Sequence, residues 1–573
     1  MSFSVVLIGQ NPQQISLKID STDQKCFNKR NFKISFSDLE SLERFRKDRW
    51  GEGYLEASID TVLALEGNRT AVFHLGSRYV WSDIELVGDS SYCFQVMEEA
   101  LNKKKGAYVN VGFLEVLKQN ILDCYANSGY PLAQIKQKAK LSDNNVALML
   151  DLDRGQLVTV DSVKIIGGLS IRKKLLPFVT GIKLNEPYSE KAFSEISSKL
   201  KALSYVKIDS QPQLRIRRNK ASILLYLDEK KTSYLNGIMG FSTDPNNASR
   251  LRINGDFNMN FQNALSYGEL FRADWKSQVD GGQNLEIEAS FPSLNKNGTG
   301  VKGQIEMFKQ DSSFLNFNAG FSLLINDLHT NYSLGLVTGF SNVLFIDTVS
   351  VIQVQKLPAQ LDFIKRSLSI GYGFKKIKEA AYFDRVWSFV LEGGIVFKEL
   401  LKPQSITTIK TDDLGSRFSS QLDSINQNRW NFEGLLVLES RFVLLRRLAL
   451  FSKLEAGGYL SNVYLDNEVF VRGGIHSVRG FNDGSLRAHQ YVYQNLELHF
   501  ALDLNSSVYL FSDNAWLEHF LNDLNPWYLG FGMGLKFDMP QGVFSFAYAY
   551  GLHESQNFNW TQAKVHFGYI NYF

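Results

Sequence analysis

The 573-residue sequence contains no long apolar run, and this absence argues against one large class of proteins. No window reaches the roughly eighteen uninterrupted apolar residues that a membrane-spanning helix needs, so we do not expect a helical membrane protein. A large excess of either charge is also missing, because the chain has 62 lysines and arginines and 59 aspartates and glutamates, which leave a net charge of +3. No strongly basic domain stands out, so nucleic acid is not an expected partner.

Residue patterns typical of catalytic and metal sites are scarce as well. The eight histidines show no HExxH pattern and no paired ligand spacing, and no GxSxG motif accompanies them. His476 is beside Ser477, but neighbours on a strand point to opposite faces. We therefore expect no enzyme, no metal and no cofactor.

Cysteine is rare, with Cys26, Cys93 and Cys124 all in the first quarter of the chain. Their spacing matches no metal-ligand pattern. Two interpretations stay open, namely buried thiols or one disulfide between Cys93 and Cys124.

Aromatic residues, in contrast, are abundant. They make up 13% of the chain, with 42 phenylalanines and 24 tyrosines, and this composition favours membrane-spanning strands over membrane helices. The N-terminal sequence MSFSVVLIGQNPQQ has a short apolar run followed by small and polar residues, as at the end of a secretory signal. We interpret residues 1–10 as the remnant of a signal peptide, with a short first strand as the alternative.

The first 230 residues contain an internal repeat. Gly53-Tyr54 in GEGYLEASI and Gly129-Tyr130 in NSGYPLAQI are 129 − 53 = 76 residues apart, and Tyr205 in ALSYVKIDS follows 75 residues after Tyr130. Each unit reads strand, helix, helix, strand, strand. The predicted helices before the aromatic residues cover residues 36–47, 111–126 and 190–203.

Three tandem units of this size and pattern resemble POTRA domains, which are small α+β domains. Exposed edges of their sheets can pair with an extended incoming chain. We expect POTRA domains at residues 11–78, 79–155 and 156–230. We interpret the Gly-Tyr pairs as structural, with a turn that glycine permits and an aromatic ring that anchors the sheet.

From about residue 231 the hydrophobic period changes to two. In RLRINGDFNMNF, apolar residues alternate with polar ones, and the pattern returns in NLEIEASF and WSFVLEGGIVF. A closed barrel satisfies every backbone group in lipid while its apolar face points outward. At roughly 20 residues per strand and connection, residues 231–573 predict an antiparallel transmembrane β-barrel of about sixteen strands.

The segment GGIHSVRGFNDG places Val478, Arg479, Gly480 and Phe481 together. It resembles the loop-six signature of the Omp85 superfamily, and YLFSDNAW further on resembles that family's Phe-x-Asp-x-Gly motif. With the POTRA-like repeats, the resemblance to the BamA/TamA family covers essentially the whole chain. The three-repeat layout is most similar to the TamA branch.

The resemblance implies a role for the arginine. In the family, loop six folds into the barrel lumen and its arginine pairs with acidic residues, which here would be Asp513 and Glu497. A buried guanidinium needs such partners. Two interpretations of Arg479 stay open, a brace for the barrel or a direct role in substrate movement. Ala515 departs from the motif, where glycine is usual.

The two ends of the barrel sequence carry further expected site residues. The family is thought to open a seam between its first and last strands, and Gly237 and Gly240 would limit packing at that seam. The C-terminal segment resembles an outer-membrane recognition signal, which His566, Gly568 and the terminal Phe573 fit and Asn571 does not.

The resemblance implies a bacterial outer-membrane protein with periplasmic POTRA domains. It would insert or export client proteins through the seam, in contact with the lipid bilayer and with a periplasm-spanning partner protein. A two-partner-secretion-type transporter is the main alternative. A passive channel and a barrel enzyme are further alternatives, and the three repeats have no purpose in a passive channel.

Overall fold

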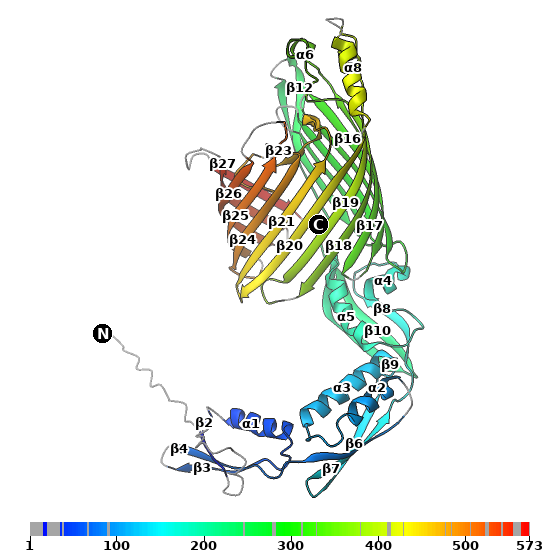
Figure 1. Cartoon of the computed structure of the whole chain (residues 1–573), viewed down its shortest axis with the longest axis vertical. Helices are drawn as coiled ribbons and strands as arrows, with labels where there is room; N and C mark the ends of the chain where they lie inside the picture. The colour runs from blue at the N-terminus through cyan, green and yellow to red at the C-terminus, as the bar shows by residue number, and fades with distance from the viewer. Residues whose placement is uncertain are drawn as a thin grey trace, which may run out of the picture. The chain divides into compact units, whose positions relative to one another are not determined.

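A computed structural model gives the fold of this chain (Figure 1). The residues that it describes are 15–19, 35–36, 39–65, 68–88, 92–244, 247–277, 282–310, 313–327, 329–378, 380–409, 414–427, 429–475, 477–482, 484–504, 506–521, 526–539, 542–553 and 563–571. The predicted signal remnant, Cys26, His476 and Phe573 lie outside them.

The chain divides into two compact units, which we treat separately. Residues 1–163, 183–194 and 214–223 belong to the first unit, and the remaining residues belong to the second. Among the described residues, no helix has the length and apolar character needed to cross a lipid bilayer.

The first two repeats each form a small mixed sheet, accompanied by one described helix in the first repeat and by two in the second. The first sheet has the order β2-β1-β4-β3, with β1 and β4 parallel, and the second has the order β5-β7-β6, with β5 and β7 parallel. Their elements are β1 (Ile15–Ile19), β2 (Ser35–Phe36), α1 (Leu39–Gly51), β3 (Ser58–Leu65), β4 (Asn68–His74), β5 (Val80–Val87), α2 (Tyr92–Asn102), α3 (Val111–Asn127), β6 (Gln134–Ser142) and β7 (Asn145–Asp153).

The third repeat has the sheet order β8-β10-β9. Its elements are β8 (Thr159–Ile166), the 3₁₀ turn η1 (Lys173–Leu175), α4 (Leu176–Thr180), α5 (Glu190–Lys201), β9 (Val206–Arg217) and β10 (Lys220–Glu229). The second and third repeats thus follow the predicted order of strand, helix, helix, strand, strand.

The helix predicted for residues 36–47 was wrong at its start. Phe36 lies in β2 and pairs with Ile15 of β1, while α1 begins at Leu39. Pairing with a strand distant in sequence overrides the local helical pattern.

The Gly-Tyr turns have a common geometry that explains their repetition. Gly53 and Gly129 adopt φ values of +100° and +96°, which favour glycine. The carbonyl of Gly53 accepts the backbone N–H of Tyr79, and that of Gly129 accepts the N–H of Val158. Each turn therefore bonds to the residue just before the first strand of the next repeat.

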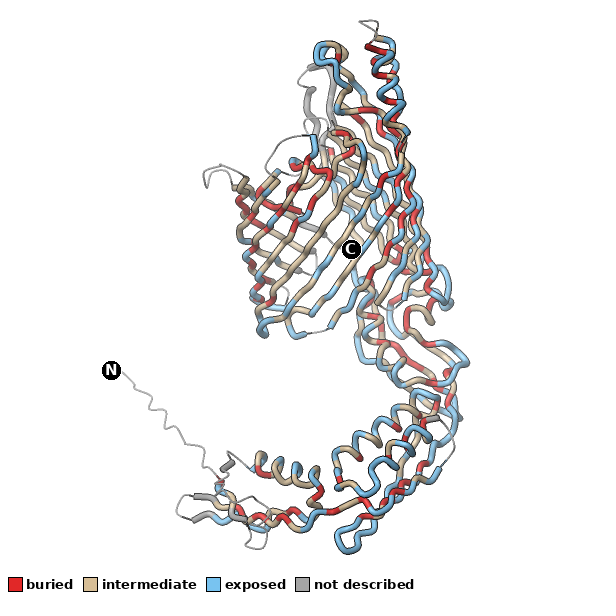
Figure 2. Tube along the Cα trace, viewed as in Figure 1, coloured by how far each residue is buried: buried red, intermediate tan, exposed pale blue. Residues whose placement is uncertain are grey.

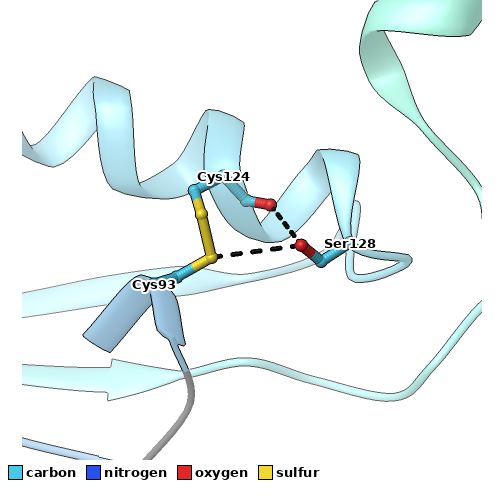
Figure 3. The surroundings of a disulfide bond; sticks show 3 residues. All are labelled: Cys93, Cys124 and Ser128. Atoms are coloured by element: carbon cyan, nitrogen blue, oxygen red, sulfur yellow. Dashed lines mark hydrogen bonds between the residues drawn. A yellow bond between two sulfur atoms is a disulfide. The ribbon is translucent and has the colours of Figure 1, made fainter. Parts of the chain in front are cut away.

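A disulfide joins Cys93 of α2 to Cys124 of α3, with their Cα atoms 6.0 Å apart (Figure 3). Between the two open interpretations of these cysteines, the structure therefore selects the bridge. Cys93 belongs to the hydrophobic core of the second repeat, together with Met97, Leu150 and Trp81. Disulfides persist in oxidising compartments, the bacterial periplasm among them.

Replacing both bridged cysteines by serine should loosen the second repeat. The bridge closes a loop of 31 residues, for which chain entropy predicts a loss of about 4 kcal/mol in the free energy of unfolding. Limited proteolysis of the full chain should cut residues 80–153 several-fold faster in this variant. Cys26→Ser is the matched control, and equal cleavage rates in all three proteins would refute the expected contribution.

The second unit contains the predicted barrel. Its sixteen-stranded antiparallel sheet runs from β11 to β28 in sequence order, with β24 following β21. The strands are β11 (Tyr234–Asp244), β12 (Asn247–Gln262), β13 (Leu270–Ser277), β14 (Gln283–Phe291), β15 (Thr299–Gln310), β16 (Phe314–Asn326), β17 (Thr330–Val343), β18 (Phe363–Lys378), β19 (Arg385–Leu400), β20 (Trp430–Leu445), β21 (Leu448–Leu460), β24 (Gln490–Ala501), β25 (Ser506–Glu518), β26 (Trp527–Met539), β27 (Gly542–His553) and β28 (Lys564–Asn571). The predicted fold class is therefore confirmed.

The two faces of the barrel wall differ as the period of two predicts (Figure 2). Trp387, Leu391 and Ile395 alternate along β19 and are about half exposed, as lipid-facing residues are. The opposite face is polar. It surrounds a cavity of about 620 Å³ whose lining includes Glu306, Lys365, Glu433, Tyr459 and Arg472.

The longer connections at one end of the barrel form a small apolar core of their own. Phe418 and Leu422 of α8 (Leu414–Ile425) pack with Ile406 of α7 (Gln404–Thr407) and Val351 of α6 (Thr348–Val354). Leu465 joins this core from the connection that follows β21. That connection leads through η3 (Asp466–Glu468), β22 (Phe470–Arg472) and β23 (Leu486–Ala488) to β24.

Candidate functional site in the barrel lumen

The segment that contains Arg479 is the tip of a hairpin. β22 and β23 pair with each other in a two-stranded sheet, with Val471 opposite Arg487. β21 and β24, which flank the hairpin in sequence, are neighbours in the barrel wall. The hairpin therefore begins and ends on adjacent strands, and we call residues 461–489 loop six.

Arg479 bonds with two carboxylates on adjacent strands. Its Nε and Nη2 atoms donate to the two oxygens of Asp513 on β25, at 2.8 and 2.7 Å, in a bidentate pair. Its Nη1 atom donates to Oε1 of Glu497 on β24 at 2.6 Å. The backbone N–H of Arg479 also donates to Asp513, at 2.9 Å, so this carboxylate holds both the side chain and the main chain of the loop.

The ion pair is buried. Arg479 is 4% exposed and Asp513 is fully buried. Buried charges are tolerated when excellent geometry and further hydrogen bonds compensate for their lost hydration. Asn495 supplies such bonds, because its side-chain amide donates to Asp513 at 2.8 Å and to the carbonyl of Ser477 at 2.6 Å. The guanidinium carbon also lies 3.8 Å from the centroid of the Phe511 ring.

The tip of loop six lies against a glycine pair in the barrel wall. Gly530 of β26 and Gly551 of β27 are register partners. A Cβ atom on Gly530 would collide with the carbonyl oxygen of Arg479, and one on Gly551 would lie 2.7 Å from the carbonyl oxygen of Gly480. Gly480 itself has φ of +91°. Only a wall without side chains at these two positions accommodates the loop backbone.

The other two motif residues contribute packing. Val478 is fully buried in an apolar cluster with Tyr491, Tyr493 and Ala515. The methyl group of Ala515, at the position where the family has glycine, is therefore part of this cluster. Phe481 packs edge-to-face on Tyr528 of β26, with ring centroids 5.5 Å apart.

Loop six has a second buried anchor that sequence reasoning missed. Lys398 of β19 donates to Glu468 at 2.6 Å, and both side chains are about 5% exposed. The side-chain amide of Asn467 donates to Oγ of Ser341 on β17 at 2.7 Å. Nothing in the local sequence singles out these residues, since they lie far apart in the chain.

The residues expected at the seam lie on the two terminal strands. Gly237 pairs with Phe257, and Gly240 with Asn254, in the ladder between β11 and β12. His566 pairs with Ala547, and Gly568 with Ser545, in the ladder between β27 and β28. These residues belong to β11 and β28, and none of them contacts the Arg479 cluster in the described interactions.

The contact between β11 and β28 differs from every other contact in the wall. Fifteen consecutive strand pairs form antiparallel ladders, as the sheet order shows. Residues of β11 and β28 approach within 8 Å, Cα to Cα, yet over their described residues no ladder joins them. The seam is therefore the one junction of the described wall that lacks strand pairing.

Part of the second unit is similar in sequence to a known protein family. Residues 424–571 match the family model described as the Omp85 superfamily domain. Omp85 proteins are transporters and assembly factors of the bacterial outer membrane. No curated protein matches the sequence.

Solved structures with the same fold extend the similarity beyond the Omp85 domain. CdiB from Escherichia coli aligns with a TM-score of 0.53 at 14% identity, covering 93% of this chain and 97% of that one. CdiB from Acinetobacter baumannii gives a TM-score of 0.50 with the same identity and coverage. BamA from Haemophilus ducreyi lacking POTRA domains 1–3 aligns at 16% identity and a TM-score of 0.45, covering 86% of this chain and all of that one.

Proposed function

We propose that this protein inserts client proteins into the bacterial outer membrane, or exports them across it, through the seam between β11 and β28. The three repeats would lie in the periplasm, where they handle clients or bind a periplasm-spanning partner. Over the residues that the structure describes, β11 and β28 approach each other without forming a strand ladder, and this observation carries the proposal.

The physical argument rests on unsatisfied backbone groups. Within a bilayer, each unpaired N–H or C=O group costs several kcal/mol, so an open strand edge seeks a partner. An extended client strand can supply the missing hydrogen bonds by strand addition, whatever its sequence. Such templating requires no nucleotide and no cofactor.

The contacts of the Arg479 cluster with the last strands of the barrel also support the proposal. Loop six contacts four consecutive strands of the wall, β24, β25, β26 and β27, and these strands lead to β28. A loop fixed to these strands makes that side of the wall rigid up to the last strand. We infer that Arg479 acts as a brace that confines opening to the seam, and is not itself a substrate-contacting group.

Covalent closure of the seam should abolish function. We expect cysteine pairs introduced along residues 235–237 of β11 and 565–567 of β28, in a Cys26→Ser background, to form disulfides across the seam. Cells that depend on a crosslinked variant should then lose outer-membrane barrels or secreted proteins, as cells depleted of the protein do, and a reductant should restore them.

The reductant also reaches the native Cys93–Cys124 bridge, so the uncrosslinked Cys26→Ser protein treated in the same way is the control. Quantitative proteomics of membranes and medium separates the two client classes, because insertion changes barrel levels and export changes secreted proteins. Full function of a completely crosslinked seam, or unchanged levels of all these proteins after depletion, would contradict the proposal.

A further inference from the structure

Two neighbouring turns of the barrel carry a cluster of basic residues. The turns join β18 to β19 and β20 to β21. They lie at the same end of the barrel as the turn between β12 and β13, whose Ser266 accepts the backbone N–H of Arg172 in the third repeat. We call the following five residues the basic rim: Lys376, Lys378, Arg385, Arg446 and Arg447.

The strand residues of the basic rim point away from the lumen. On β18, Lys365 and Ser367 line the internal cavity, so the residues of opposite parity, Lys376 and Lys378, face outward. Lys378 is paired with Arg385 of β19 and Lys376 with Trp387, which is 53% exposed. All five basic residues are exposed.

The two turns are held together by one tyrosine. Nη2 of Arg447 donates to the hydroxyl of Tyr382 at 3.3 Å, and the guanidinium carbon of Arg446 lies 5.9 Å from the centroid of the Tyr382 ring. The cationic groups of the two turns are thus gathered on one patch of the rim.

Among the described residues of these two turns, Asp384 is the one that carries a carboxylate. None of the five basic residues forms an ion pair there, and the nearby Asp384 accepts the backbone N–H of Ala380. The adjacent turn between β16 and β17 carries Asp327 instead of basic residues. The positive charge is therefore local to one side of the rim.

The outward face next to the basic rim is apolar and aromatic. Trp387 and Phe442 pack edge-to-face with ring centroids 5.0 Å apart, and Leu444 and Leu445 are 53% and 68% exposed. The outward face of β19 runs from Ile395 and Leu391 through Trp387 to Arg385 at the turn. This order of aliphatic, aromatic and then basic residues matches the layers of a bilayer, from acyl chains through the interface to the head groups.

We propose that the basic rim binds the head groups of anionic phospholipids in the leaflet at this end of the barrel. The basic rim continues the lipid-facing belt, and its charge complements a phosphodiester. This proposal rests on the proposed insertion of the barrel into a membrane. Bound anionic lipid would hold the β18–β21 side of the barrel in the bilayer. These strands are in the middle of the sheet order, whereas the seam lies between its first and last strands.

The test uses the full chain in vesicles of phosphatidylethanolamine and phosphatidylcholine with trace spin-labelled lipids. Electron paramagnetic resonance compares the motionally restricted fraction of labelled phosphatidylglycerol with that of labelled phosphatidylcholine. The wild-type protein should prefer phosphatidylglycerol by roughly tenfold, since several basic residues near a membrane surface attract an anionic head group and salt screens part of that attraction. A Lys376→Gln, Lys378→Gln, Arg385→Gln variant should lose most of this preference.

The matched control removes three exposed lysines from β6 of the second repeat, as Lys136→Gln, Lys138→Gln, Lys140→Gln, and should keep the preference. Inorganic phosphate at millimolar concentration should not displace the label, because a free anion lacks the acyl anchor. Equal restriction of both lipids by the wild-type protein, or an unchanged preference in the rim variant, would overturn the proposal. Vesicle flotation reports insertion separately, so a protein that does not insert at all argues against the proposed function and not against the rim alone.

Discussion

Arg479→Glu should strongly destabilise the barrel. The substitution removes a guanidinium that holds Asp513 and Glu497, and it adds a third carboxylate beside them. Removing one partner of a buried ion pair costs about 3–5 kcal/mol, because the remaining charge stays buried without compensation. Unheated protein on a denaturing gel should then lose the fast migration that a folded barrel shows.

The direct contact with Asp513 is tested by reversing the charges of both partners. In the Arg479→Glu, Asp513→Arg protein, the new arginine lies between two carboxylates, and fast migration should return in part. Recovery should be incomplete, since the backbone N–H of Arg479 loses its acceptor on Asp513. Arg44→Glu, which breaks the exposed Arg44–Glu40 pair, is the control and should migrate as wild type. A double variant no better than Asp513→Arg alone would count against direct pairing.

Gly530→Ala should produce a similar defect without any change in charge. The added methyl group would collide with the carbonyl oxygen of Arg479, which belongs to the loop backbone and cannot rotate away. The tip of loop six must then move off β26, and the bidentate pair with Asp513 is lost with it. Overpacking of this kind typically costs about 1–3 kcal/mol, and trypsin should begin to cleave after Arg479, which the wild-type fold buries.

Gly393→Ala is the matched control for that experiment. Gly393 also lies in the middle of a barrel strand, and a Cβ atom there would meet no heavy atom within 4 Å. Neither glycine has a positive φ, so backbone strain does not distinguish the two substitutions. Gly393 is on the exposed face of β19 with Leu391 and Ile395, where a methyl group has open space. Trypsin resistance of Gly530→Ala equal to that of Gly393→Ala would show that loop six does not depend on a bare wall.

The class of fold could be predicted from the sequence because hydrophobic periods are local. A period of two along Trp387, Leu391 and Ile395 is a property of one strand, and the structure places these residues on one exposed face. The start of α1 could not be predicted in the same way. Phe36 belongs to a helical pattern, but it joins β2 because Ile15 offers it a strand partner.

The acidic partners of Arg479 could be named from sequence only because a family motif points to them. Physical reasoning alone requires some carboxylate, and the chain has 59 acidic residues to offer. The place of Asn495 beside the ion pair could have been predicted from the sequence, since it lies two residues before Glu497 and therefore on the same face of β24. No sequence pattern predicts the contacts Lys398–Glu468 and Asn467–Ser341, because they join segments 70 and 126 residues apart.

The sequence by itself determined the alternation of the strands, the threefold repeat and the presence of a charged motif between glycines, since these depend on neighbours in the chain. The tertiary structure was needed to show that Cys93 meets Cys124 and that Gly530 and Gly551 leave space for the backbone of Arg479. It was also needed to show that the described residues of β11 and β28 meet without a strand ladder. Each of these depends on which distant segments come within a few ångströms of each other. Closure of a sheet brings such segments together, and no local pattern records the result.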